Sequence, residues 1–88
     1  MSSNALETRR KKLLFRAQRR GFREMDLIFG AFADRHLADL DEAGLECFEG
    51  LLAASDWQVY RWILGHEAVP AIYDNTVFAR LRAYRDEL

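Results

Sequence analysis

The sequence predicts an all-α protein, a small irregular bundle of five helices that forms a single domain over residues 1–88. Three observations support this prediction. Apolar residues recur at three- and four-residue steps, and no segment alternates as a strand would. Proline, which interrupts helices, occurs only once in the chain. Half of the residues are hydrophobic and the net charge is −1, which favours a folded core over disorder.

The first two expected helices cover residues 6–19 and 22–37. The first has a narrow apolar stripe among basic side chains, formed by Leu6, Leu13, Leu14 and Ala17. The second has a wider stripe, typical of a central helix, formed by Phe22, Met25, Ile28, Phe29, Phe32 and His36. We expect residues 1–5, which precede the first stripe, to be flexible.

The third and fourth helices are predicted from their capping residues. Asp41 can cap the third helix, with Leu40 and Leu45 as a hydrophobic staple around it. The fourth begins at Ser55 or Asp56, and its end fits a glycine at position 65. It contains Trp57 and Trp62, whose spacing of five residues places them on different faces and leaves open which one is exposed.

The fifth helix starts near Asp74, after Pro70. Its apolar residues are Val77, Phe78, Leu81 and Tyr84. Three arginines, at positions 80, 82 and 85, lie in its last turns, where cations suit the negative end of the helix dipole.

Residues that could catalyse a reaction or bind a metal are not spaced as such sites require. His36 and His66 are far apart in sequence, and the one cysteine, Cys47, has no neighbouring base. We expect a core-edge His36, a loop His66 and a small buried Cys47. An acidic cluster at positions 39–42 is better explained by capping than by acid–base chemistry. The sequence therefore predicts a protein that is not an enzyme and holds no metal.

Charge is distributed unevenly along the chain. Residues 1–23 carry eight Lys or Arg and one acid, a net +7, whereas residues 24–88 carry a net −8. This asymmetry indicates either an acidic or polyanionic partner, or a solvated basic face that neutralises its own body. No apolar run approaches the roughly 18 residues of a transmembrane helix, so we expect no membrane insertion.

The stretch RRGFREMD, residues 19–26, places a glycine inside a charged helical pattern. Gly21 falls where the first helix should stop, and glycine can take a positive φ there without steric cost. Two interpretations remain open. In one, Gly21 is a helix cap and Arg20 and Glu24 form a surface pair worth well under about 1 kcal/mol. In the other, Gly21 gives a partner close access to the backbone, with Arg20 and Glu24 as a charged clamp.

This stretch and its surroundings resemble the succinate dehydrogenase FAD assembly factor family, which includes bacterial proteins and the mitochondrial assembly factor 2. The family signature Arg-Gly-x-x-Glu is matched by Arg20, Gly21 and Glu24. Residues 9–33 resemble the basic first helix, the signature and the hydrophobic second helix of the family. A downstream family pattern is matched by Phe48, Leu51, Leu52, Asp56 and Trp62. The resemblance covers residues 9–84.

The resemblance implies a five-helix assembly factor that binds the flavoprotein subunit of succinate dehydrogenase and, in some bacteria, of fumarate reductase. It would promote covalent attachment of FAD to a histidine of that subunit, without binding FAD stably itself. The implied partner-binding residues are Arg20, Gly21 and Glu24, with Phe22, Arg23 and Asp26 beside them. Whether the factor contacts FAD directly, and which flavoproteins it serves, stay open.

Only nineteen residues precede Arg20, as in bacterial family members, whereas mitochondrial members have an N-terminal extension. We therefore expect a cytoplasmic, bacterial protein. We also expect a monomer, a state that the sequence itself leaves open. The alternatives are an antitoxin-like protein and a small nucleic-acid-binding protein that uses the basic N-terminal helix. The acidic remainder and the absence of a clear recognition helix argue against binding to nucleic acid.

Overall fold

The computed structural model describes residues 2–87, with the side chains of residues 5–86, and confirms an all-helical fold with five α-helices and no strand among these residues. The α-helices are α1 (Ser2–Ala17), α2 (Arg23–His36), α3 (Glu42–Ala53), α4 (Asp56–Leu64) and α5 (Thr76–Ala83). Three short 3-10 helices join or end them, namely η1 (Leu37–Asp39), η2 (Ala71–Tyr73) and η3 (Tyr84–Glu87).

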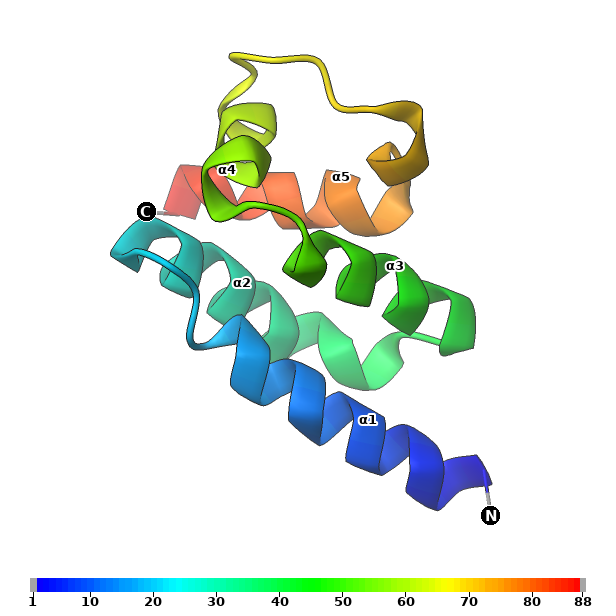
Figure 1. The fold of residues 1–88 in the computed structure, drawn as a ribbon. Helices are drawn as coiled ribbons and strands as arrows, with labels where there is room; N and C mark the ends of the chain where they lie inside the picture. Colours follow the sequence, from blue (N-terminus) through cyan, green and yellow to red (C-terminus); the bar gives the residue numbers. More distant parts are fainter. Residues whose placement is uncertain (1, 88) are drawn as a thin grey trace.

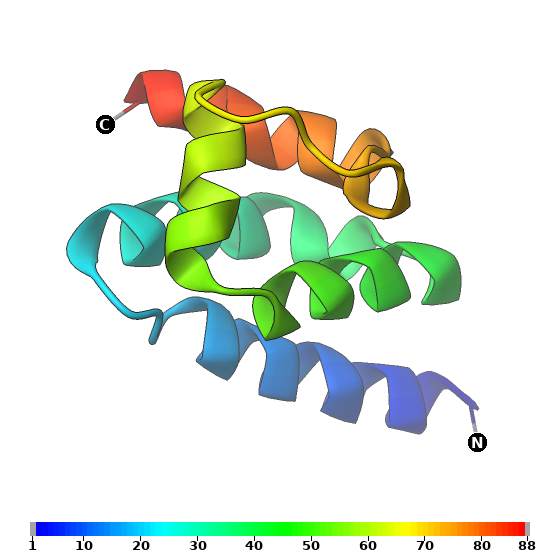
Figure 2. The same ribbon diagram turned by 45° about the horizontal axis from the view of Figure 1, so that its top comes forward.

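The helices form three layers (Figure 1). Figure 2 shows α1 on one side, α2 and α3 side by side in the middle, and α5 on the other side. Helix α4 runs across the layers at the end where the loop between α1 and α2 also lies. The irregular arrangement predicted from the short helices is therefore confirmed, and it brings residues 18–22 close to the start of α4.

The core lies between the middle layer and its two neighbours, and it is built around aromatic rings. The Phe48 ring centroid lies 5.7 Å from that of Phe29 and 5.2 Å from that of Phe32. His36 is partly buried at the edge of this core, where its Nε2 and the Tyr84 hydroxyl lie 2.7 Å apart in a hydrogen bond. The prediction of a core-edge histidine is confirmed.

The capping residues predicted for the starts of α3 and α4 are confirmed, and the one predicted for α5 is displaced by one residue. The Asp41 side chain accepts a hydrogen bond from the Gly44 N–H at 2.8 Å, as predicted for the N-cap of α3. Ser55 is the N-cap of α4, although its side chain forms no capping bond. Helix α5 begins later than expected, because Asn75 rather than Asp74 accepts the Phe78 N–H.

The prediction for the end of the first helix is wrong in two respects. Helix α1 ends at Ala17, and Gly21 lies beyond it in a loop. Among the described residues, the glycine with a positive φ is Gly65, at 79° at the end of α4, and not Gly21. The start also differs, since α1 begins at Ser2 instead of residue 6. The flexibility expected of residues 1–5 stays a prediction, and Met1 lies outside the described residues.

Replacing Gly65 by alanine is expected to lower the free energy of unfolding by about 1 kcal/mol, because a Cβ disfavours the left-handed conformation. Gly30→Ala is the control. Gly30 lies inside α2, and an added Cβ would find its nearest neighbour, Gln18 Cγ, at 4.0 Å. We expect this change to raise stability by about 0.5–1 kcal/mol. Urea denaturation followed by circular dichroism measures both, and equal stabilities would contradict the assignment of Gly65.

Candidate protein-interaction surface

Arg20 lies in the loop between α1 and α2, and its side chain points into the molecule rather than into solvent. Only 7% of the side chain is exposed. Its Nη1 donates to the Leu52 carbonyl at 2.5 Å, and its Nη2 donates to the Ala54 carbonyl at 3.3 Å. These carbonyls lie at the end of α3, where the helix itself leaves acceptors unsatisfied. Arg20 therefore attaches the loop to the junction between α3 and α4.

The charge of Arg20 is balanced by Asp56, the first residue of α4, with which it forms an ion pair. The guanidinium also lies over the Phe29 ring, 4.8 Å from its centroid. Burial lowers the pKa of Arg20 from its ordinary value, while the Asp56 carboxylate opposes this shift. An arginine stays charged at neutral pH even when it is shifted in this way. Of the two interpretations left open, the surface pair between Arg20 and Glu24 is thus wrong, because Arg20 pairs with Asp56.

Gly21 is close to the same carboxylate. Its backbone N–H donates to Asp56 Oδ2 at 2.7 Å. A Cβ at this position would overlap Oδ2 and would lie 3.2 Å from the Asp56 carboxyl carbon. The glycine therefore permits a close approach to its backbone, as one interpretation of the sequence held. The group that makes this approach belongs to the same chain.

Asp26 closes the loop from its other side. Its carboxylate accepts the backbone N–H of Arg20, and its own N–H donates to the Phe22 carbonyl at 3.0 Å. Phe22 has an extended backbone (φ −155°, ψ 166°) at the start of α2. The loop is consequently held at Arg20, Gly21 and Asp26 by bonds within the chain.

Glu24 and Arg23 behave differently from these residues. Glu24 is half-buried in the first turn of α2, and Arg23 is exposed beside it. Neither side chain forms a hydrogen bond or ion pair with any residue that the structure describes. Their charges are therefore available to another molecule.

Three aromatic rings border the loop. Phe22 stacks on Trp57 with ring centroids 4.3 Å apart and an interplanar angle of 18°. The Phe22 and Tyr60 rings meet edge to face, with centroids 5.2 Å apart. Trp57 is 60% exposed, whereas Trp62 is buried in the core. The structure thus settles which tryptophan is exposed, and it places that tryptophan on a residue of the signature stretch.

The basic face of α1 is partly occupied by contacts within the chain. Arg9 and Arg16 pair with Glu49 of α3 at 2.9 Å and 3.8 Å, and Arg10 donates to the Leu40 carbonyl at 2.8 Å. These contacts support the interpretation in which the basic helix neutralises part of its own acidic body. Phe15 is exposed on the same helix, under the Arg19 guanidinium.

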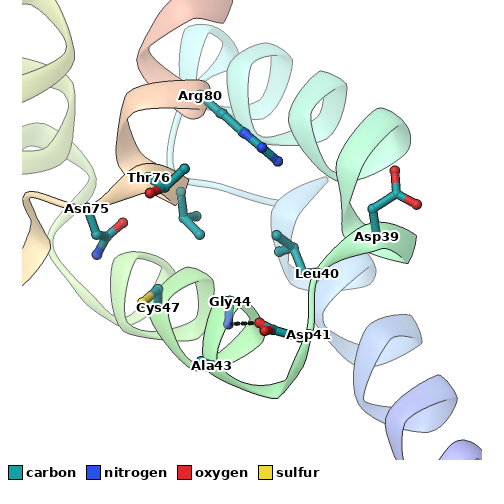
Figure 3. A pocket seen from close by; sticks show the side chains of 10 residues that line it. Asp39, Leu40, Asp41, Ala43, Gly44, Cys47, Asn75, Thr76 and Arg80 are labelled. Atoms are coloured by element: carbon teal, nitrogen blue, oxygen red, sulfur yellow. Dashed lines mark hydrogen bonds between the residues drawn. The ribbon is translucent and has the colours of Figure 1, made fainter.

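A pocket of about 380 Å³ opens between the N-terminal ends of α3 and α5 (Figure 3). Arg80, Asp39 and the half-buried Cys47 are among its lining residues, so Cys47 is less enclosed than predicted. None of the six predicted partner-binding residues lines it. The structure describes residues 2–87, and among the side chains that it places, those of residues 5–86, no group of His, Cys, Asp and Glu could hold a metal ion. None of the helices in this range is long and apolar enough to cross a membrane.

Two residues of this surface were not predicted in their observed roles. Asp56 was expected as a helix cap, and its pairing with Arg20 joins positions 36 apart in sequence. No role in this surface was predicted for Tyr60. The sequence contained no signal for either contact beyond the match of Asp56 to the downstream family pattern.

Comparison with known proteins confirms the family that the sequence resembles. A family model described as the flavinator of succinate dehydrogenase (Sdh5) matches residues 11–85. The mitochondrial succinate dehydrogenase assembly factor 2-B of Drosophila mojavensis is 30% identical over 83 residues, which cover 92% of this chain and 53% of that protein. Assembly factor 2 of Mycosarcoma maydis is 35% identical over 69 residues, 78% of this chain and 29% of that protein.

Assembly factor 2 of Aedes aegypti is similar to the same degree, with 30% identity over 79 residues. The chain spans about half the length of these insect relatives, and its match to the family model extends over most of its own length. The protein therefore belongs to the family of succinate dehydrogenase flavinators and assembly factors.

Proposed function

We propose that this protein binds the flavoprotein subunit of succinate dehydrogenase and promotes the covalent attachment of FAD to it. Membership of the flavinator family supports this function, as do the assembly-factor names of the relatives. The structural observation that carries the proposal is the combination of a firmly held loop with the unpaired charges of Glu24 and Arg23 beside an exposed aromatic stack. Such a surface suits binding, and the attachment chemistry would take place within the flavoprotein.

The six residues assigned to partner binding divide into two groups. The first group consists of the exposed Gly21, the unpaired Arg23 and Glu24, and Phe22, which belongs to the exposed aromatic stack with Trp57. Arg20 and Asp26 hold the loop in place, because their polar groups form hydrogen bonds within the chain. We therefore propose that the first group contacts the flavoprotein and that the second fixes its geometry. A rigidly positioned set of side chains gives more precise recognition than a flexible one.

The exposed rings and the charges would contribute in different ways. Trp and Tyr are frequent among the residues that dominate binding energy at interfaces, and Trp57 and Tyr60 flank Phe22. The unpaired charges of Glu24 and Arg23 would set orientation and association rate more than affinity. A contact of this kind can be specific and still dissociate, as an assembly factor requires.

The resemblance extends the proposal to the flavoprotein of fumarate reductase as a second client. We also propose that the factor works as a monomer, holds no FAD stably and acts in a bacterial cytoplasm. The relatives compared above are mitochondrial proteins of eukaryotes. Cell fractionation and size-exclusion chromatography test location and oligomeric state directly.

The Glu24→Ala and Trp57→Ala variants are expected to bind the flavoprotein subunit about tenfold more weakly and to lower its covalent flavin content. Neither change should reduce folding stability by more than about 0.5–1 kcal/mol, because both side chains are exposed or unpaired. Calorimetry with purified subunit measures affinity, and flavin fluorescence of the denatured subunit in gels measures attachment.

Ile72→Ala is the matched control for these variants. Ile72 is 78% exposed in η2. This segment lies well apart from the loop between α1 and α2 (Figure 1). Its replacement should leave affinity and flavin content unchanged. Normal flavin attachment with both Glu24→Ala and Trp57→Ala would refute the assignment of this surface.

A further inference from the structure

We propose that Asp56 is a positioning residue for the flavoprotein-binding loop, and that its carboxylate sets the position at which Gly21, Phe22 and Glu24 meet the partner. This inference rests on the function proposed above. It assigns a role to a residue of α4, outside the signature stretch, that does not itself need to contact the flavoprotein.

The two carboxylate oxygens of Asp56 serve two different parts of the loop. Oδ1 faces Nη2 of Arg20, and Oδ2 accepts the Gly21 N–H at 2.7 Å. One carboxylate thus fixes both a side chain and the adjacent backbone amide. A hydrogen bond with an ionised acceptor is shorter and stronger than a neutral one, so it restricts the loop more effectively.

Asp56 is oriented toward the loop rather than toward its own helix. It is the first residue of α4, where a carboxylate suits the helix dipole, but Ser55 holds the N-cap position. The Asp56 side chain instead accepts a hydrogen bond from the loop, at the Gly21 N–H. The next residue, Trp57, stacks on Phe22. Two consecutive residues of α4 therefore hold two consecutive residues of the loop.

The Arg20–Asp56 pair is also the most enclosed ion pair among those formed by the described residues. The side chains of Arg20 and Asp56 are 7% and 24% exposed, whereas those of Arg61 and Glu67 are 46% and 45% exposed. Low solvent exposure makes a charge pair less sensitive to screening by salt. The position of the loop should therefore depend little on ionic strength.

The loop can remain attached in part when Asp56 is changed. Arg20 would keep its bonds to the Leu52 and Ala54 carbonyls and its position over the Phe29 ring. An asparagine at position 56 would present one oxygen and one NH2 group in place of two carboxylate oxygens, and it would carry no charge. Its NH2 group would then face either Arg20 or the Gly21 N–H, both of which are donors. Asp56→Asn should therefore release the Gly21 amide without unfolding the protein.

The experiment compares Asp56→Asn with Asp41→Asn in the full chain. Asp41 is the matched control, because its carboxylate also accepts a backbone N–H, from Gly44 at 2.8 Å, at the start of α3. We expect Asp56→Asn to accelerate hydrogen exchange of the Gly21 amide at least tenfold and to raise the Kd for the flavoprotein subunit about tenfold. Asp41→Asn should change neither quantity by more than twofold.

Asp56→Glu provides a second variant that keeps the negative charge beside Arg20. Its longer side chain should lose the bond to the Gly21 N–H and should weaken binding as Asp56→Asn does. Binding at wild-type affinity by both variants, with faster exchange of the Gly21 amide, would overturn the positioning role. An unchanged exchange rate in both variants would overturn it as well.

A double mutant separates this inference from the proposed function. If Asp56 acts by positioning Glu24, then Asp56→Asn should weaken binding less in a Glu24→Ala background than in the wild type, because coupled residues are not additive. Full additivity would contradict the role. Loss of binding with Glu24→Ala but not with Asp56→Asn would refute this inference alone. Normal binding with Glu24→Ala and with Trp57→Ala would refute the proposed surface itself.

Discussion

Replacing Arg20 by alanine is expected to lower the free energy of unfolding by about 3–5 kcal/mol, the largest effect of any single change to the signature stretch. The change removes a cation that is almost fully buried and leaves Asp56 without its counter-ion. It also leaves the Leu52 and Ala54 carbonyls without their donor. Single domains are usually stable by only about 5–15 kcal/mol, so a measurable fraction of the variant should be unfolded at physiological temperature.

Urea denaturation followed by circular dichroism measures this loss, and Arg85→Ala provides the control. Arg85 also donates to a backbone carbonyl near a helix end, that of Ile63 at 2.7 Å, but its side chain is much more exposed. Its replacement should cost less than about 1 kcal/mol. A similar loss of unfolding free energy in the two variants would show that burial of Arg20 is not the cause of the large effect.

Adding a single methyl group at Gly21 is expected to have the second-largest effect. The Cβ of Gly21→Ala would overlap Asp56 Oδ2, so the carboxylate must move away and the bond to the Gly21 N–H must lengthen or break. We expect a stability loss of about 1–3 kcal/mol, as for other cases of overpacking. We also expect binding of the flavoprotein subunit at least tenfold weaker than in the wild type.

Gly50→Ala is the control for this steric argument. Gly50 lies within α3, and a Cβ there would lie 3.8 Å from Tyr73 Cε1, an ordinary van der Waals distance. Because alanine favours helices more than glycine does, this change should leave stability equal or up to about 1 kcal/mol higher. Thermal unfolding and calorimetry would be measured for both variants. A fully stable, tightly binding Gly21→Ala protein would exclude the close approach as the reason for this glycine.

The three residues of the signature differ in whether their polar groups are bonded within the chain. The polar groups of Arg20 and the N–H of Gly21 are bonded within the chain, to the end of α3 and the start of α4. Glu24 forms no such bond with the described residues. Loss of function after changing Arg20 or Gly21 can therefore arise from the fold of the loop. Glu24 is the position at which a change tests recognition most directly.

The helices and several of their ends could be predicted from the sequence because they depend on residues only a few positions apart. Periodic apolar residues indicated the five helices and the faces they bury, and Asp41 and Gly65 marked two of their ends correctly. The bounds of α1 and the start of α5 were predicted less well. Asn75 replaced Asp74 at α5, for example, since the choice depends on backbone geometry that propensity does not specify.

The fold class, most of the core and the stretch that matches the family could all be inferred from the order of residues alone. The packing of the helices was needed to establish that Arg20 pairs with Asp56, that the same carboxylate approaches the backbone of Gly21, and that Trp57 rather than Trp62 is exposed. Periodicity specifies which face of a helix is apolar, but not which other helix that face meets. An ion pair between distant segments, like the exposure of an aromatic ring, depends on which helices pack together. Neither therefore has a local signal in the sequence.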